Sequence, residues 1–288
     1  MSALVIVRFI HFASVMLVFG ASMFRPLMLD HPAQQKRVRN LLDPLLCLVA
    51  GVGLISAALW LLLVSADMND IGFTSLNLDA VRNVLGGTFF GKVWSLHLML
   101  CAALLLCLRI PTARTAVVAR PLSALALATL APIGHAAMLD GLDGTLLVIN
   151  QLIHLFCVGA WMGALMLLTF ILAKPGSQDI RELLLRFSAI GFVLVTGVLV
   201  TGLINVRVLT GAFWPVPGQS GFATVLAVKA ALVLGMLGLA AYHRRHLRAA
   251  RLSATQLRWS VGAEWALGFA ALAAVSLLGT LAPVPMGA

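Results

Sequence analysis

The sequence consists of long apolar runs separated by short polar connections. A helix needs about 20 mostly apolar residues to cross a bilayer, and runs of that length recur along the whole chain. They predict about eight transmembrane helices, at residues 3–28, 41–66, 89–108, 121–139, 146–173, 187–206, 222–242 and 260–281. The first run is long and has neither a charged start nor a clear cleavage site. We therefore interpret it as the first helix and not as a removed signal peptide.

The composition supports a membrane location. Hydrophobic residues make up 61% of the chain and charged residues only 10%, whereas about a quarter of a soluble domain is charged. No segment is polar enough to form a separate soluble domain, so we expect a single all-α polytopic membrane domain over residues 1–288. The four cysteines lie inside apolar runs without C-x-x-C spacing, which predicts neither a disulfide framework nor a zinc ribbon.

The net charge of +10 suggests nucleic-acid binding at first sight, but the basic residues are spread between the apolar runs. They gather in the connections after the first, third, fifth and seventh runs: Arg25, Lys36, Arg37, Arg39; Arg109, Arg114, Arg120; Lys174, Arg181, Arg186; and Arg244, Arg245, Arg248, Arg251, Arg258. The other connections hold little beyond Arg82, Lys92 and Arg207. Basic loops stay in the cytoplasm, so both termini are expected in the periplasm of a bacterial inner membrane, and no nucleic-acid partner is expected.

The first and fifth runs resemble each other. The first reads RFIHFASVMLVFGASMF and the fifth reads QLIHLFCVGAWMGALML. At one constant offset, this aligns His11 with His154, Gly20 with Gly163 and Met23 with Met166. The fourth and eighth runs both end in TLAP. The pattern predicts two four-helix repeats, residues 1–143 and 144–288, in the same orientation about an axis along the membrane normal. The alternative is chance similarity between helices rich in leucine and alanine.

Polar groups inside a bilayer are costly, so each is a candidate functional group. His11, His97, His135 and His154 fall on four different predicted helices, within roughly 12 Å of the outer surface at about 1.5 Å rise per residue. Any one of them could be a histidine that only hydrogen-bonds a neighbouring helix. Taken together, His11, His135 and His154 favour one shared site, whereas His97 could fill a packing gap. Lys229 lies at a similar depth with no acidic residue at its level.

The helix that carries His154 indicates which ligand the site binds. At about 100° per residue, Cys157 and Trp161 share the face of His154, while Met162 and Met166 turn progressively away and are interpreted as core. An imidazole beside a soft thiol suits copper, especially Cu(I), better than magnesium or calcium. We therefore predict copper, as Cu(I) or Cu(II), with these candidate ligands: His11, His97, His135, His154 and Cys157.

Several segments resemble the copper resistance protein D family. They are the first run, TFFGKVW before His97, GHAA at residues 134–137, and IHLFCVGAWMGALM at residues 153–166. The resemblance spans essentially the whole chain, and GHA and the H-x6-W-x-G pattern beginning at His154 are its most specific parts. It implies copper homeostasis at the inner membrane, inward movement of copper and a small periplasmic copper-binding partner. It implicates His11, His135 and His154, but not position 97, where many relatives are expected to carry a basic residue.

Two other functions are compatible with these patterns. A b-type haem protein that carries electrons would need histidines on facing helices, for which His11 with His154, or His97 with His135, are candidate pairs. A structural membrane subunit would need no ligand at all. The sequence contains no P-loop, HExxH, GxSxG or Rossmann glycine pattern, so we do not predict an enzyme. It also shows no obvious ligand path through the inner half of the membrane.

Overall fold

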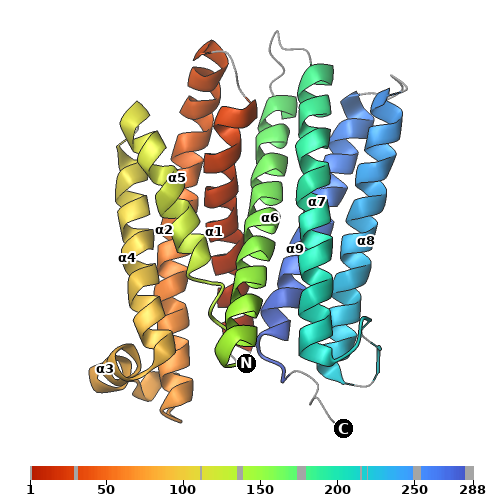
Figure 1. The fold of residues 1–288 in the computed structure, drawn as a ribbon. Coiled ribbons are helices and arrows are strands. Elements are labelled where there is room, and N and C mark those ends of the chain that lie inside the picture. The colour runs from red at the N-terminus through yellow and green to blue at the C-terminus, as the bar shows by residue number, and fades with distance from the viewer. Residues whose placement is uncertain are drawn as a thin grey trace.

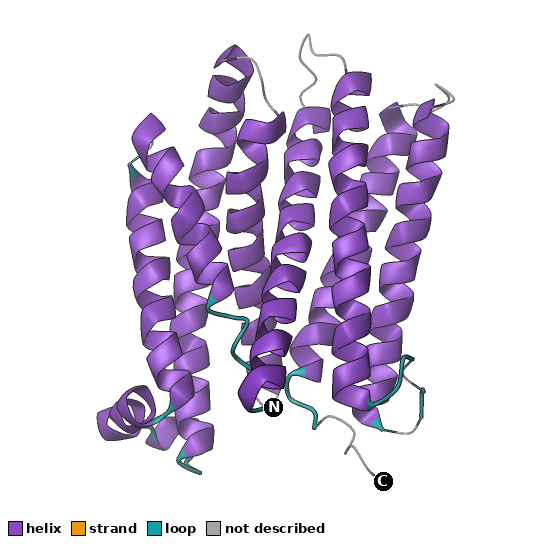
Figure 2. Cartoon of the chain, in the orientation of Figure 1, coloured by secondary structure: helices purple, strands orange, loops and turns teal. Residues whose placement is uncertain are grey.

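The computed structural model describes residues 2–28, 32–110, 112–134, 139–173, 180–214, 216–218, 220–248 and 254–282. Within these ranges the chain forms helices and connections and no strand (Figures 1 and 2). The α-helices are α1 (Ser2–Met28), α2 (Pro32–Met68), α3 (Leu78–Gly87), α4 (Phe89–Arg109), α5 (Ala113–Ala128), α6 (Gly141–Ala173), α7 (Ile180–Thr210), α8 (Gly221–Arg248) and α9 (Ala254–Leu278). The predicted all-α class is confirmed.

Seven of these helices are long and apolar enough to cross a membrane: α1, α2, α4, α6, α7, α8 and α9. They stand side by side (Figure 1). They alternate in direction along the chain, except that α4 and α6 run the same way because α5 returns the chain between them. The predicted order of long helices is thus confirmed, apart from the fourth. α5 is apolar but falls below the length of a full span.

The fourth helix begins before the predicted range, residues 121–139, and ends within it. α5 already begins at Ala113, after Thr112, whose side chain caps the first turn, and it ends at Ala128. The TLAP sequence explains the end, because Pro132 lacks the N–H of a helical residue and disfavours helix in the residue before it. Tighter turns replace the helix there, with Leu130 N–H donating to the carbonyl of Leu127 at 3.1 Å.

The helix α3 was not predicted either, since residues 67–87 read as a connection. Its first turn is capped by Asn77, whose side-chain oxygen accepts a hydrogen bond from the N–H of Ala80 at 2.9 Å. It packs against the beginning of α4, where Gly91 allows close approach: a Cβ at this position would lie 1.9 Å from the carbonyl oxygen of Val84. Figure 1 shows α3 at the end of the bundle where α1 begins.

Helices α1 and α6 form the centre of the bundle and run in the same direction (Figure 1). They cross at two glycines: a Cβ on Gly20 would lie 2.0 Å from the carbonyl oxygen of Gly159, and one on Gly163 would lie 2.0 Å from the carbonyl carbon of Gly20. Small residues at such a crossing let two membrane helices pack backbone to backbone. The two glycines at the crossing, Gly20 and Gly163, are the pair that the sequence repeat aligns.

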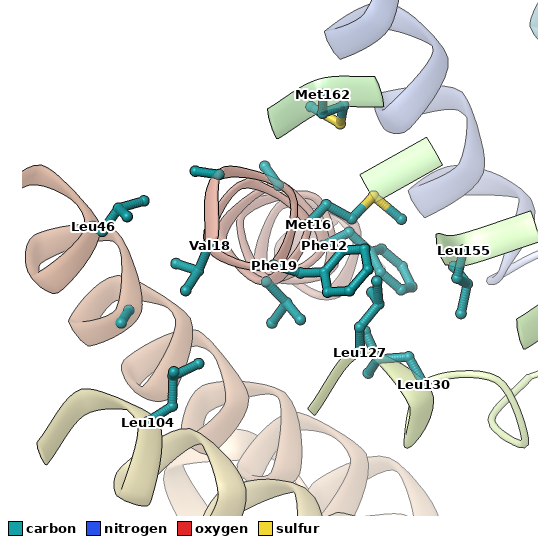
Figure 3. Close-up of a cluster of buried hydrophobic side chains, with 14 of the residues drawn as sticks. Phe12, Met16, Val18, Phe19, Leu46, Leu104, Leu127, Leu130, Leu155 and Met162 are labelled. Carbon is teal, nitrogen blue, oxygen red and sulfur yellow. The ribbon is translucent and has the colours of Figure 1, made fainter. Parts of the chain in front are cut away.

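The apolar core surrounds α1. Figure 3 shows Phe12, Met16, Val18 and Phe19 of α1 with Leu46 of α2, Leu104 of α4, Leu127 of α5, Leu130, and Leu155 and Met162 of α6. The ring of Phe19 stacks on that of Phe156 with 5.1 Å between centroids. Met162 and Met166 are both buried in this core, as the sequence predicted for them.

The helix contacts follow the same pattern in both halves. α1 contacts α2, α5, α6 and α9, and α6 contacts α7, α9, α1 and α5. Likewise α4 packs on α2 and α5, and α8 packs on α7 and α9. Apart from a smaller contact of α1 with α7, an exchange of the two halves would reproduce this set of neighbours. Superposition of the halves stays a prediction.

The helices α1, α4, α6 and α8 all finish at the same end of the bundle (Figure 1), and most of the basic residues lie near these helix ends in the sequence. α1 begins and α9 ends at the opposite end. Near the basic end, the guanidinium of Arg25 forms an ion pair with the carboxylate of Asp43. The helix ends near which the basic residues lie are therefore on one side of the bundle, as predicted. The side of the membrane that each end faces stays a prediction.

Candidate metal centre

His11 of α1 and His97 of α4 are fully buried and face each other. Their ring centroids lie 4.9 Å apart with an edge-to-face angle of 71°. The rings of Trp60 and Trp94 each lie 5.6 Å from that of His11. Together with Cys101, these residues form what we call the α1–α4 cluster: His11, Trp60, Trp94, His97 and Cys101.

The local sequence of α4 builds one side of this cluster. Trp94, His97 and Cys101 are spaced by three and four residues, so they share one helix face. The ring of Trp94 stacks on that of His97 at 4.7 Å between centroids, and its indole N–H donates to the carbonyl of Ala57 on α2 at 3.0 Å. Both contacts fix the imidazole of His97 in the direction of α1.

The hydrogen bonds of His11 assign its tautomer. Its Nδ1 lies 3.1 Å from the carbonyl oxygen of Gly53 and 3.1 Å from the hydroxyl of Ser56. A carbonyl oxygen can only accept, so Nδ1 carries the hydrogen and donates it. The second ring nitrogen, Nε2, is buried without a hydrogen-bond partner among the described residues. His11 therefore presents an Nε2 lone pair to the interior of the cluster.

His97 has the same tautomer. Its Nδ1 lies 2.6 Å from the hydroxyl oxygen of Thr129, and this hydroxyl donates its own hydrogen to the carbonyl of Ala126 at 2.7 Å. The oxygen of Thr129 therefore accepts from Nδ1. On the other side of the ring, Nε2 lies 3.3 Å from the sulfur of Cys101, so the thiol is the donor in that contact.

His154 of α6 repeats this arrangement in the second half of the chain. Its Nδ1 lies 2.8 Å from the hydroxyl oxygen of Thr201 on α7, which itself donates to the carbonyl of Gly197. Cys157 faces the same helix, because a Cβ on Gly197 would lie 2.6 Å from its sulfur. The predicted common face of His154 and Cys157 is thus the face packed on α7.

The described residues do not assemble the predicted shared site. His11 bonds α2 and faces α4, whereas His154 bonds α7, and His135 follows α5 and lies outside the described residues. Within the described ranges, no three side chains of His, Cys, Asp or Glu stand close enough to hold a metal ion as they are. The shared site of His11, His135 and His154 stays a prediction.

Cys101 is the residue at this site that sequence reasoning missed. The informative signal was its position four residues after His97, because residues at that spacing touch on a helix surface. His97 was included as a doubtful ligand, yet it is the histidine closest to a thiol in the described part of the chain.

The surroundings of His11 do not favour the haem alternative. In one of the two candidate pairs, that of His97 with His135, His135 lies outside the described residues. In the other pair, His11 would have to face His154 across a porphyrin. Instead Trp60, Trp94 and His97 surround its ring at 4.9–5.6 Å between centroids. These side chains fill the space that a macrocycle would need.

A second feature is a cavity of about 290 Å³ beside His154, lined mainly by residues of α1, α6, α7, α8 and α9. Its wall is mostly aliphatic and aromatic, with polar groups from Gln151 and Asn205. Two cations, Arg8 and Lys229, also line it, and no aspartate or glutamate does. We call this space the α6–α9 cavity.

The fold and the α1–α4 cluster define an all-α membrane protein with buried imidazole and thiol groups, which are the donors that copper prefers. Two family models match the chain. Residues 1–146 match the model described as "Copper resistance protein D-like, N-terminal domain", and residues 181–278 match "Copper resistance protein D". The chain belongs to the copper resistance protein D family, as its resemblance predicted.

Three curated relatives are similar to the chain. "Inner membrane protein YebZ" of Escherichia coli is 29% identical over 96% of this chain and 97% of its own length. "Copper resistance protein D" of Pseudomonas syringae pv. tomato is 27% identical over 96% of both chains. "Copper transport protein CutJ" of Bacillus subtilis is 30% identical over 53% of this chain and 28% of its own length. No solved structure matches the chain.

Proposed function

We propose that this protein accepts copper at the periplasmic side of the bacterial inner membrane, binds it through membrane-embedded histidines and moves it inward. The names of its relatives support a copper-handling role at the inner membrane: one is an inner membrane protein, one a copper resistance protein and one a copper transport protein. A periplasmic copper-binding protein is the proposed donor. The bilayer surrounds the seven long apolar helices.

The observation that carries this proposal is Nε2 of His11, which is buried without a partner among the described residues, next to the ring of His97, which in turn contacts Cys101. Histidines that ligate a metal usually donate their other ring N–H to a carbonyl or a similar acceptor, which fixes the ring and its tautomer. His11 makes such a bond to Gly53, and His97 makes one to Thr129. The free electron pair and the neighbouring thiol are the nitrogen and sulfur donors that suit Cu(I).

Copper binding would change the contact between Cys101 and His97. The thiol must lose its proton to become a ligand, and the hydrogen bond to Nε2 of His97 must break, so that both groups turn to the metal. His11 would then complete the site from α1. The further predicted ligands are His135, His154 and Cys157. Copper would reach them before or after it binds to the α1–α4 cluster.

The test is equilibrium competition for Cu(I) between the purified full-length protein and a chromogenic Cu(I) chelator. Removal of even an outer-shell partner weakens metal binding about 10–100-fold, so Cys101→Ser and His97→Asn should each weaken it by at least that range. The matched control is Cys107→Ser, since Cys107 lies on the same helix but donates to the carbonyl of Thr115 at the other end. Each variant is first checked for a single size-exclusion peak.

X-ray absorption on the copper-loaded protein provides the second readout. Sulfur and nitrogen neighbours are expected for the wild type, and nitrogen or oxygen neighbours only for Cys101→Ser. Unchanged affinity in both Cys101→Ser and His97→Asn would remove the α1–α4 cluster as the copper site. A loss confined to His154→Ala would place copper in the second half instead.

The proposed orientation has its own test. A periplasm-dependent reporter fused after Ala288 should be active, and a cytoplasm-dependent reporter at the same place should be inactive. The reason is that α9 ends opposite to the ends of α1, α4, α6 and α8, near which most basic residues lie in the sequence. The reverse pattern would put the termini in the cytoplasm and would contradict acceptance of copper from the periplasm.

A further inference from the structure

The α6–α9 cavity has a chemistry of its own, separate from the α1–α4 cluster. We propose that it binds an amphipathic anion, a molecule with one carboxylate or phosphate head and an apolar chain. Its volume of about 290 Å³ lies near the lower end of pockets that hold small ligands, about 300–1,000 Å³. This inference does not depend on copper binding at the α1–α4 cluster.

The charges that line the cavity call for an anion. Lys229 of α8 contributes an ammonium group and Arg8 of α1 a guanidinium group, and the lining contains no carboxylate. Among the described residues neither cation forms an ion pair. A charged side chain in a membrane interior is costly unless it is paired, and such residues usually mark a ligand path or site. A bound anion would supply the counter-charge that the protein lacks.

Arg8 is held in place, but its hydrogen-bonding capacity is not used up. Its Nη1 donates to the carbonyl of Gly279 at 3.0 Å, and its guanidinium lies 4.8 Å from the centre of the Trp60 ring. Its Nε is buried without a partner among the described residues. The bond to Gly279 and the ring of Trp60 thus fix the cation at the wall of the cavity without neutralising it.

The polarity of the wall changes with depth. Depth is measured here along each helix from its end on the side where α1 begins. At about 1.5 Å rise per residue, Asn205, Arg8 and Lys229 lie at depths of about 8, 9 and 12 Å. Met16 of α1 and Met236 of α8 line the cavity about 21–22 Å from the same end. The head of a ligand would therefore lie at the level of the cations, with its apolar chain directed toward the middle of the membrane.

Two cations, Arg8 and Lys229, line the cavity, so a copper ion is disfavoured in the space beside them. Like charges repel strongly where water is scarce. The two sources of the proposed chemistry are an acidic phospholipid from the surrounding bilayer and a free amphipathic organic acid, and both present the same head and chain.

The test uses 11-(dansylamino)undecanoic acid as a fluorescent probe with the full-length protein in a neutral detergent. Saturable fluorescence enhancement is expected, with at least about tenfold weaker binding in Lys229→Met, because a charge-assisted hydrogen bond is lost. Lys92→Met is the matched control, since Lys92 is exposed near the beginning of α4 and is absent from the cavity wall. The corresponding uncharged alcohol should bind wild type at least about tenfold more weakly than the acid.

A second variant tests the space instead of the charge. Ala230→Trp places an indole in the cavity, keeps both cations and should abolish enhancement by the probe. Repeating the titration in nanodiscs of phosphatidylcholine, with or without phosphatidylglycerol, identifies the source. Displacement by phosphatidylglycerol indicates a lipid ligand, and unchanged binding indicates a free acid. Equal affinity for acid and alcohol, or wild-type affinity in both Lys229→Met and Ala230→Trp, would overturn the proposal.

Discussion

The two halves of the chain use a buried histidine in opposite ways. His11 in the first half lies in a closed cluster in which two indoles and a second imidazole touch its ring. His154 in the second half, at the position that the repeat aligns with His11, lies at the wall of an open cavity of about 290 Å³. Both rings donate a hydrogen bond from Nδ1 to the neighbouring helix. The two sites therefore differ in the side chains that surround the rings.

The side chains one turn further along the neighbouring helix account for much of this difference. On α2, Ser56 is followed four residues later by Trp60, which is buried and packs on His11. On α7, Thr201 is followed four residues later by Asn205, which instead exchanges hydrogen bonds with α6. Asn205 is smaller than tryptophan and lines the α6–α9 cavity. A similar helix framework can thus form a packed cluster or a ligand cavity, depending on a few side-chain volumes.

The largest predicted effect concerns the contact between the halves. Gly20→Ala should destabilise the protein by about 3 kcal/mol or more, because the new Cβ would lie 2.0 Å from the carbonyl oxygen of Gly159 and backbone atoms cannot move aside. Denaturant unfolding in detergent measures the change. Gly238→Ala on α8 is the control, since its Cβ would meet nothing within 4 Å. If the two variants were equally stable, the halves would not be joined at Gly20.

An enlarged side chain should distinguish the closed region from the open one. Ala57→Leu, at a fully buried position on α2 beside Trp94, should cost about 1–3 kcal/mol because the cluster has no spare volume. Ala230→Leu should instead be neutral or raise stability by up to about 1 kcal/mol, because it fills part of the α6–α9 cavity. Thermal unfolding midpoints measured in parallel compare the two. Equal losses would mean that the second half is as tightly packed as the first.

The smallest predicted difference concerns the hydrogen bonds that orient the histidines. Thr129→Val removes the acceptor for Nδ1 of His97 and should cost about 1–2 kcal/mol, because a buried N–H is left without a partner. Thr201→Val removes the acceptor for His154 and should cost less than about 1 kcal/mol, since water in the cavity can replace the hydroxyl. Denaturant unfolding of both variants is the measurement. A larger loss in Thr201→Val would show that the cavity does not admit water.

Hydrophobic patterning predicted the helices well and the chemistry of the interior less well. The long apolar runs placed seven spans close to their observed bounds, because membrane helices must be long and apolar whatever they pack against. The run ending in TLAP was misplaced, since an apolar sequence continues through residues 129–134 although Pro132 prevents a helix there. The contact of His97 with Cys101 was visible as a spacing, but the contact of His97 with His11 joins residues 86 positions apart on two helices.

The sequence by itself determined the all-α membrane class, the alternation of basic connections, the family, and the resemblance between the helices that carry His11 and His154. These properties depend on local composition and on residues close together in the chain. Only the tertiary structure decided which rings meet, that Nε2 of His11 has no partner in the described part of the chain, and that Arg8 and Lys229 share one cavity. The reason is physical. Hydrophobicity and helical periodicity are properties of a single segment of the sequence. Burial, the hydrogen bonds between helices and empty volume arise only where separate segments pack together.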